Sequence, residues 1–367
     1  MKRMAAVVFL VLWCLTVQSF AIAPNDISAK SAVVYDGLTG KVLFEKNSKA
    51  HMPIASTTKI MTAYTSLKIY ELDRRYEIRP SWTGIEGSSM YLKTGEELSV
   101  EELLYGLMLM SGNDAAVALS SCLTGNGEDF VALMNRYATQ LGLNDTHFEN
   151  PNGLDEGDHH STAYDMARLT AEAMRLPEFR KIVGTANISI AGRYMKNHNR
   201  LLGMYPGICG VKTGFTKKAG RCLVSAAESM GRQVIVVTLS APDDWNDHIK
   251  LYDKYIGVLE EADILPTGEI GSARIVSGER GNCPLYVNSG FSVGIMPEEG
   301  ERIKISLEGP RMVYAPVCAG DLYGKVVITL DDVEIASREV YYKQDIAELG
   351  GAENIGFFGL LKRIFRK

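Results

Sequence analysis

Cysteine is scarce in this sequence, and its globular part has no cluster of basic residues. Six cysteines occur in 367 residues without a CxxC pair, and five of them follow the N-terminal apolar run: Cys122, Cys209, Cys222, Cys283 and Cys318. An odd number of cysteines in a chain of this length argues against a disulfide scaffold. Cys283 and Cys318 could pair, with buried reduced thiols as the alternative. The net charge of -5 gives no support for nucleic-acid binding.

The N-terminal apolar run is too short for a typical membrane span. Residues 1–23 start with a basic pair, continue with an apolar core over residues 5–15, and end in the small-x-small pattern Ala21-Ile22-Ala23. This arrangement is typical of a secretory signal peptide, with an uncleaved anchor as the alternative. We therefore expect a mature chain that begins near Pro24, is secreted, and acts on the extracytoplasmic side of the cell membrane.

Composition and periodicity indicate an α+β protein with two folded domains. Apolar residues make up 46% and charged residues 23% of the chain, as in ordinary globular proteins. Residues 24–262 mix helical and strand patterns, whereas residues 263–345 hold only short alternating runs. The second segment is therefore predicted to be a small β-sandwich-like domain.

Strand and helix patterns follow one another in blocks within residues 24–262. Residues 32–36 and 41–44 flank a glycine-containing turn and predict a hairpin, after which helical patterns dominate residues 56–184. Three further strands with short turns are predicted at residues 207–215, 221–227 and 233–239. A last helix is predicted over residues 245–261, so this domain should be an antiparallel sheet flanked by helices.

Residues 346–367 end the chain in an amphipathic pattern. On a helix, one face would carry bulky apolar groups and another would carry cations: Phe357, Phe358, Leu361, Ile364 and Phe365 against Lys362, Arg363, Arg366 and Lys367. The pattern predicts a peripheral anchor on an anionic membrane surface, preceded by a flexible tether around Gly350-Gly351. The alternative is a helix packed on its own domain.

Ser56-Thr57-Thr58-Lys59 places a hydroxyl and an amine three residues apart at the start of an apolar helical pattern. Residues three apart share a helical face, so the two side chains should lie together. A lysine can deprotonate a serine only if burial or a nearby cation lowers its pKa. Because about one such match is expected by chance in a chain of this length, a helix cap with a solvated lysine is the alternative for this motif alone.

Two later motifs carry side chains that could serve in the same acyl-transfer chemistry as Ser56 and Lys59. Ser111-Gly112-Asn113 lies between two apolar helical runs, where a hydroxyl and an amide could relay protons and hold a substrate backbone. Lys212-Thr213-Gly214 ends the first of the later strands, where the glycine would let a substrate backbone approach closely. Each motif alone also fits ordinary turn or sheet-edge chemistry.

Together the three motifs form the set shared by penicillin-binding proteins and class A β-lactamases. The chain resembles the serine-type D-alanyl-D-alanine carboxypeptidases among the low-molecular-mass penicillin-binding proteins, peptidase family S11. Five further stretches carry this resemblance: Tyr35-Asp36-Gly37, Thr39-Gly40, and residues 150–154, 160–165 and 210–222. The resemblance implies a transpeptidase-like fold, and it continues more loosely through the β domain to the amphipathic tail.

The resemblance also implies a function and a set of acylation residues. Ser56 would be the nucleophile, Lys59 its general base, and Ser111 would pass a proton to the leaving D-alanine. The backbone amides of Ser56 and Phe215 would form the oxyanion hole. The expected reaction removes the terminal D-alanine from peptidoglycan stem pentapeptides during cell-wall biogenesis, without cofactor or metal, and β-lactams would act as covalent inhibitors.

The resemblance implies that the remaining motif residues bind the substrate. Asn113 would hold the acylated substrate, Lys212 and Thr213 would bind the terminal carboxylate region, and Gly214 would leave room for the backbone. Lys212 should also keep Lys59 neutral by charge repulsion. Some family members use an arginine beyond this strand for the carboxylate, but residues 243–248 here contain none. Two other arginines, Arg193 and Arg232, are candidates for this role, and the alternative for each is a solvated surface residue.

Three other interpretations are compatible with the fold or with single motifs. A β-lactamase would need a carboxylate positioned to activate water, and Gly112 in place of aspartate together with the extra β domain argues against it. A metalloenzyme could use Asp158-His159-His160, although the chain has no HExxH motif and adjacent histidines rarely bind one ion. A cell-wall scaffold without turnover would retain the fold, but the intact serine and lysine motifs argue against that interpretation.

Overall fold

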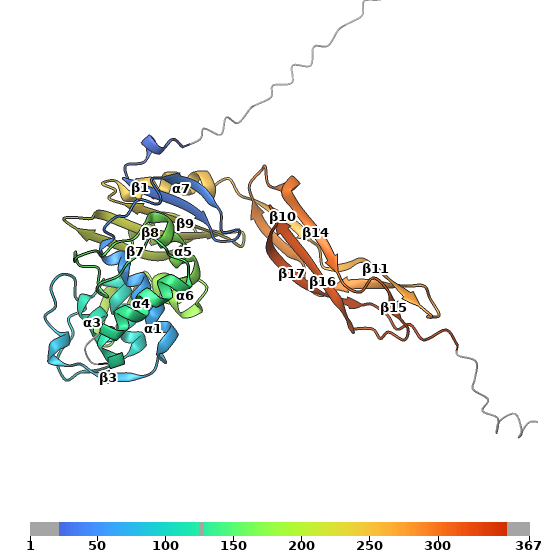
Figure 1. Cartoon of the computed structure of the whole chain (residues 1–367), viewed down its shortest axis with the longest axis horizontal. Helices are drawn as coiled ribbons and strands as arrows, with labels where there is room; N and C mark the ends of the chain where they lie inside the picture. Colours follow the sequence, from blue (N-terminus) through green and yellow to red (C-terminus); the bar gives the residue numbers. More distant parts are fainter. Residues whose placement is uncertain (1–21, 125–127, 351–367) are drawn as a thin grey trace, which may run out of the picture.

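The computed structural model describes residues 22–124 and 128–350, which form an α+β domain followed by an all-β domain (Figure 1). Nearly all of the predicted signal peptide and the part of the predicted anchor from residue 351 onward lie outside the described residues. Within the two described ranges, no helix has both the length and the apolar character needed to cross a membrane.

A five-stranded antiparallel sheet forms the centre of the first domain. Its strand order is β2-β1-β9-β8-β7. The strands are β1 (Ser31–Asp36), β2 (Val42–Lys46), β7 (Ile208–Thr216), β8 (Gly220–Ser229) and β9 (Arg232–Leu239). The predicted hairpin and the three predicted later strands are confirmed. β7 lies at one edge of this sheet, so its outer backbone groups face away from β8.

Apolar side chains of the sheet alternate between two cores. Val33 of β1 and Val237 of β9 pack in the core of the helical lobe, whereas Val34 and Val236 pack on the other face, under α7 (Asp244–Tyr255). Successive strand residues point to opposite faces, so a sheet that is covered on both sides needs continuous apolar runs. This requirement explains why the strand patterns were visible in the sequence.

Six helices form a lobe on the first of these faces: α1 (Lys59–Ile69), α2 (Val100–Leu109), α3 (Asn113–Thr124), α4 (Glu128–Gln140), α5 (Ala163–Ala173) and α6 (Pro177–Val183). Two small antiparallel strand pairs, β3–β4 and β5–β6, accompany them: β3 (Arg75–Glu77), β4 (Glu97–Ser99), β5 (Asn187–Ile190) and β6 (Arg193–Lys196). Eight consecutive residues of α1, from Lys59 to Ser66, are buried. A helix enclosed on all sides is a rigid base for reactive groups.

The helix predicted over residues 245–261 is too long at its C-terminal end. α7 ends at Tyr255, and the amide groups of Ile256 and Gly257 both bond to the carbonyl of Tyr252. A Cβ atom at Gly257 would lie 2.8 Å from the carbonyl oxygen of Asp253, so glycine allows the chain to stay close to the last helical turn. The chain then enters β10 (Glu260–Leu265), which crosses the proposed domain boundary at residues 262–263 and pairs with β13 (Phe291–Ile295) of the second domain.

The second domain is entirely β, as predicted. A six-stranded sheet follows the order β14-β16-β17-β12-β11-β15. Its strands are β11 (Gly268–Val276), β12 (Asn282–Val287), β14 (Ile303–Glu308), β15 (Val313–Tyr314), β16 (Leu322–Leu330) and β17 (Val333–Tyr342). Cys283 is buried and Cys318 is exposed, and both are free thiols, so the possible disulfide does not form. Ile346 and Leu349 still bond to the backbone of this domain.

A buried ion-pair cluster joins the two domains. Arg232 of β9 is fully buried, and its Nη2 lies 2.7 Å from Asp36 Oδ2 of β1 and 3.0 Å from Glu299 Oε1 of the second domain. A second bridge joins Lys41 Nζ to Asp331 Oδ2 at 2.7 Å. The all-β domain is therefore held at this end of the sheet and extends away from the helical lobe (Figure 1).

Candidate active site

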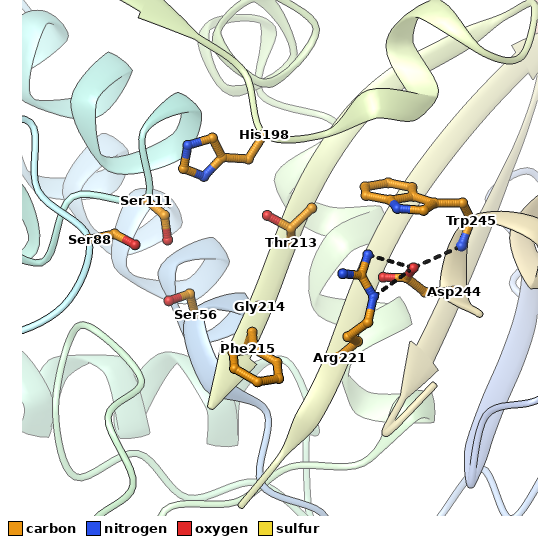
Figure 2. Close-up of a pocket in the computed structure, with 10 residues that line it drawn as sticks. All are labelled: Ser56, Ser88, Ser111, His198, Thr213, Gly214, Phe215, Arg221, Asp244 and Trp245. Atoms are coloured by element: carbon orange, nitrogen blue, oxygen red, sulfur yellow. Dashed lines mark hydrogen bonds and ion pairs between the residues drawn. The ribbon is translucent and has the colours of Figure 1, made fainter. Parts of the chain in front are cut away.

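A pocket of about 320 Å³ lies where the helical lobe meets the edge strand β7 (Figure 2). It is lined by Ser56, Ser88, Ser111, His198, Thr213, Gly214, Phe215, Arg221, Asp244 and Trp245. The three sequence motifs therefore converge on one site, although they are spread along the chain from residue 56 to residue 214. Ser88, His198, Arg221, Asp244 and Trp245 were not identified from the sequence.

Ser56 lies in a short 3-10 turn, Ala55–Thr58, that leads into α1. The sequence placed Ser56 at the start of an apolar helix, and in the structure it lies in the turn just before that helix. Ala55 has a φ of +47°, a conformation that non-glycine residues rarely adopt outside functional or strained positions. Thr57 Oγ1 donates to the Ile54 carbonyl at 2.6 Å and fixes the turn. The nucleophile candidate is thus presented on a well-braced segment.

His159 contacts the last residue of the same turn. Its Nε2 lies 2.8 Å from Thr58 Oγ1, and its Nδ1 accepts the backbone N–H of Glu149 at 3.1 Å. Burial and the neighbouring His147 lower the pKa of His159 to about 4, so the ring is neutral near pH 7. Both ring nitrogens are occupied by protein partners. Within the described ranges, no three potential ligands are grouped to hold a metal ion.

Lys59 is fully buried and contacts three oxygen atoms. Its Nζ donates to Asn113 Oδ1 and to the carbonyl of Asn152, each at 2.6 Å, and lies 3.1 Å from Ser56 Oγ. The two carbonyl oxygens can only accept, so they take two N–H groups of the amine. In a neutral amine, the remaining position toward Ser56 is the lone pair. This geometry suits Lys59 as the base for the Ser56 hydroxyl.

Electrostatics favour that neutral state. Burial lowers the pKa of Lys59 well below its ordinary value, and the charge of Lys212 lowers it further. The sequence-based expectation about Lys212 is supported, although burial is the larger cause. Lys212 is itself only 1% exposed, donates to the Thr213 carbonyl at 2.8 Å, and has a pKa lowered by burial to about 7. An anionic group bound nearby would favour its charged form.

The Ser111-Gly112-Asn113 turn connects α2 to α3, as predicted. Ser111 has a φ of +58°, which turns the chain so that its side chain reaches the pocket beside Ser56 (Figure 2). The Asn113 side chain accepts from Lys59 and donates through Nδ2 to the Glu86 carbonyl at 2.6 Å. Asn113 therefore orients the lysine in this structure.

Close contact between β7 and the 3-10 turn depends on Gly214. A Cβ atom at this position would lie 3.0 Å from Ser56 N and 3.1 Å from both Ile54 O and Thr57 N. Such distances are shorter than ordinary van der Waals contacts, so glycine allows the strand to approach Ser56. Ser56 and Phe215 therefore lie on neighbouring segments that both line the pocket. Two backbone N–H groups on such segments are suited to donate to one oxygen atom of a bound substrate.

The two arginines considered from sequence lie elsewhere. Arg193 donates to the carbonyls of Met90 and Tyr91 and pairs with Glu96, and Arg232 is enclosed in the domain joint. Neither lines the pocket, so the structure supports neither candidate for the carboxylate-binding role. The arginine in the pocket is Arg221, which lies on β8 directly opposite Phe215 of β7. Pairing the two predicted strands around their short turn would have revealed this neighbour.

A buried lysine beside a serine, at the edge of an antiparallel sheet flanked by helices, defines a serine hydrolase of the penicillin-binding class. The chain matches the peptidase S11 family, D-alanyl-D-alanine carboxypeptidase, over residues 18–243, and the C-terminal domain of penicillin-binding protein 5 over residues 260–348. It therefore belongs to the D-alanyl-D-alanine carboxypeptidase family. This result confirms the family, the fold class and the enzyme class inferred from the motifs.

Individual relatives align over nearly the whole chain. D-alanyl-D-alanine carboxypeptidase DacF of Bacillus subtilis is 31% identical over 388 aligned positions, which cover 99% of this chain and 98% of that protein. DacA of Haemophilus influenzae is 32% identical over 347 positions, covering 90% and 88%. The crystal structure of penicillin-binding protein 5 from Haemophilus influenzae has a TM-score of 0.65 at 30% identity and covers 89% of this chain and 100% of that chain.

Proposed function

We propose that the protein removes the C-terminal D-alanine from peptidoglycan stem pentapeptides through an acyl-enzyme on Ser56. The observation that carries this proposal is the buried Lys59 amine, whose two N–H groups are taken by carbonyl oxygens and whose remaining position faces Ser56 Oγ at 3.1 Å. A buried base next to a hydroxyl in a pocket is the arrangement needed for acyl transfer.

The reaction follows from these positions. Lys59 takes the hydroxyl proton while Ser56 Oγ attacks the carbonyl carbon of the penultimate D-alanine, and the amides of Ser56 and Phe215 stabilise the negative oxygen that forms. The C–N bond then breaks, and the proton returns through Ser111 to the amine of the leaving D-alanine. A water molecule hydrolyses the Ser56 ester in a second round and frees the shortened peptide.

Substrate binding falls to the β7 side of the pocket. Thr213 directs its hydroxyl into the pocket, Gly214 keeps the strand close, and Lys212 adds positive charge from beneath the surface. After acylation, Asn113 would exchange its bond to Lys59 for one to the substrate backbone. These roles match the chemistry of a terminal peptide with a free carboxylate.

The pocket lining favours a peptidase over a β-lactamase. A β-lactamase needs a carboxylate that drives water onto the acyl-enzyme. Among the residues that line this pocket, only Asp244 carries a carboxylate, and it is bonded to Arg221 at 2.7 Å. Penicillin should therefore acylate Ser56, and the resulting acyl-enzyme should hydrolyse slowly. β-Lactams would then act as covalent inhibitors.

Intact-mass spectrometry after incubation with benzylpenicillin tests the proposal. The purified protein is expected to gain one penicillin mass, and Ser56→Ala is expected to gain none. Ser66→Ala, a buried serine farther along α1, is the matched control and should be labelled like the parent protein. An unlabelled parent with intact drug would support the scaffold interpretation, and an unlabelled parent with hydrolysed drug would identify a β-lactamase.

We also propose a peripheral location on the extracytoplasmic face of the membrane. Support comes from the signal-peptide pattern of residues 1–23 and the amphipathic pattern of residues 355–367. The purified protein should sediment with vesicles containing anionic lipid, and deletion of residues 355–367 should abolish this binding without affecting penicillin labelling. Equal sedimentation of both proteins would reject the anchor.

A further inference from the structure

Arg221 projects from β8 into the pocket on the side opposite the serines. Figure 2 shows Thr213 between Ser56 and the Arg221 guanidinium group. In an antiparallel pair, directly opposed residues point to the same face of the sheet, and Arg221 is opposed to Phe215. Because residues two apart share a face, Thr213 and Phe215 also lie on this side. One face of the β7–β8 hairpin therefore presents a hydroxyl and a guanidinium group to the same pocket.

The guanidinium group is fixed by two neighbours at the start of α7. Its Nε and Nη2 donate to Asp244 Oδ1 at 3.0 and 2.7 Å, and its carbon atom lies 5.5 Å from the centre of the Trp245 ring. Trp245 also donates its backbone N–H to Asp244 Oδ1 at 2.9 Å, which holds the carboxylate in place. These contacts preorganise a side chain that is otherwise long and flexible.

This bracing leaves part of the guanidinium group available. Asp244 uses Nε and one N–H of Nη2, whereas Nη1 has no protein partner in the described part of the chain. The Arg221 side chain is 41% exposed, while that of Asp244 is 3% exposed. A cation braced on one edge and open on the other has the geometry that binds a planar carboxylate.

The proposed chemistry requires a carboxylate-binding group in this pocket. The carboxylate of the leaving D-alanine is three bonds from the carbonyl carbon that Ser56 attacks, so the binding group must line the same cavity. Of the lining residues, only Arg221 and His198 can carry positive charge. Burial and the nearby Lys212 lower the pKa of His198, which favours its neutral form. Lys212 lies beneath the surface and donates to a backbone carbonyl.

We propose that Arg221 is the carboxylate-binding residue of this enzyme, that it acts together with the Thr213 hydroxyl, and that Asp244 and Trp245 position it. Residues 243–248, which lack an arginine, thus supply the support for an arginine on the neighbouring strand. This inference rests on the proposed function and adds to it the residue that selects substrates with a free C-terminus.

The test compares two peptides that differ only at the carboxylate. One is an acetylated tripeptide that ends in D-Ala-D-Ala, and the other is its C-terminal carboxamide. The parent protein should strongly prefer the free acid. Arg221→Met should lower kcat/KM for the free acid by roughly 10- to 100-fold, the loss expected for a hydrogen bond to a charged group, with little change for the carboxamide. The preference between the peptides should therefore collapse.

Two further variants make the comparison specific. Arg200→Met removes an equal charge from a side chain that stacks on the same Trp245 ring, 5.9 Å from its centre, but does not line the pocket. It should keep the preference of the parent protein. Arg221→Lys keeps the charge but loses the planar fork, so an intermediate preference is expected even if the methionine variant fails to fold.

The outcomes separate this inference from the function on which it rests. An equal loss on both peptides, or an unchanged preference in both Arg221 variants, would mean that Arg221 only supports α7 through Asp244, and would overturn the inference alone. If the parent protein cleaved neither peptide and bound no penicillin at Ser56, the proposed function would fail, and the inference with it.

Discussion

Lys59→Met is expected to lower the rate of penicillin acylation on the order of 10²- to 10⁴-fold, the usual contribution of a positioned general base. Methionine fills a similar volume but offers no lone pair to the Ser56 hydroxyl 3.1 Å away. Lys59→Arg should be equally inactive, because a guanidinium group stays protonated near pH 7. Stopped-flow or time-resolved mass measurements of acyl-enzyme formation would give these rates.

Loss of stability must be separated from loss of the base in this experiment. Lys59→Met leaves the oxygens of Asn113 and Asn152 without their donor, and each such loss costs about 1–3 kcal/mol in a buried site. The matched control is Lys68→Met on the same helix, where the exposed amine lies over the Tyr64 ring. Rapid acylation of folded Lys59→Met would remove Lys59 from its proposed role.

Arg232→Met should destabilise the protein by about 3–5 kcal/mol, the range for removing one partner of a buried ion pair. The variant would leave Asp36 and Glu299 buried without their shared cation, which bonds to both of them in the parent protein. Urea unfolding monitored by tryptophan fluorescence would measure the difference. A loss below about 1 kcal/mol, the range of surface ion pairs, would contradict the structure.

The size of this effect should depend on pH. Burial alone would raise the pKa of Glu299, but hydrogen bonds from Arg232 and from the Met296 amide outweigh it, so the pKa is lowered. A carboxyl group with a lowered folded-state pKa adds stability above its unfolded pKa and loses it as the pH falls through the folded value. The cost of Arg232→Met should therefore shrink in acid. Arg302→Met, at the exposed edge of the same joint, is the control with a much smaller effect at every pH.

Local pattern was sufficient to predict the parts of the fold that depend on local rules. Strands β8 and β9 could be predicted because burial on both faces requires unbroken apolar runs, as at Val236 and Val237. Ser56 and Lys59 could be paired because three residues span almost one helical turn. The end of α7 was missed although Gly257 signals it, because the apolar pattern beyond that residue continued into β10.

The rest of the site depends on contacts between distant segments. Arg221, Asp244 and Trp245 meet only because a strand and a helix pack together, and no spacing along the chain encodes that contact. Arg232 could not be distinguished from a solvated arginine by its sequence context. In the structure, carboxylates from two other segments enclose it. Charged residues that act through tertiary partners are the ones that sequence patterns assign least well.

The buried ion pairs of Arg232 link the stability of one domain to the presence of the other. Arg232 belongs to the first domain, and one of its two carboxylates belongs to the second, so either domain alone would expose an unfinished, charged interior. We therefore expect the two domains to stabilise each other and to unfold together. Proteolytic cleavage between residues 256 and 259 would separate the domains. The isolated catalytic domain would then be less stable than it is within the whole chain.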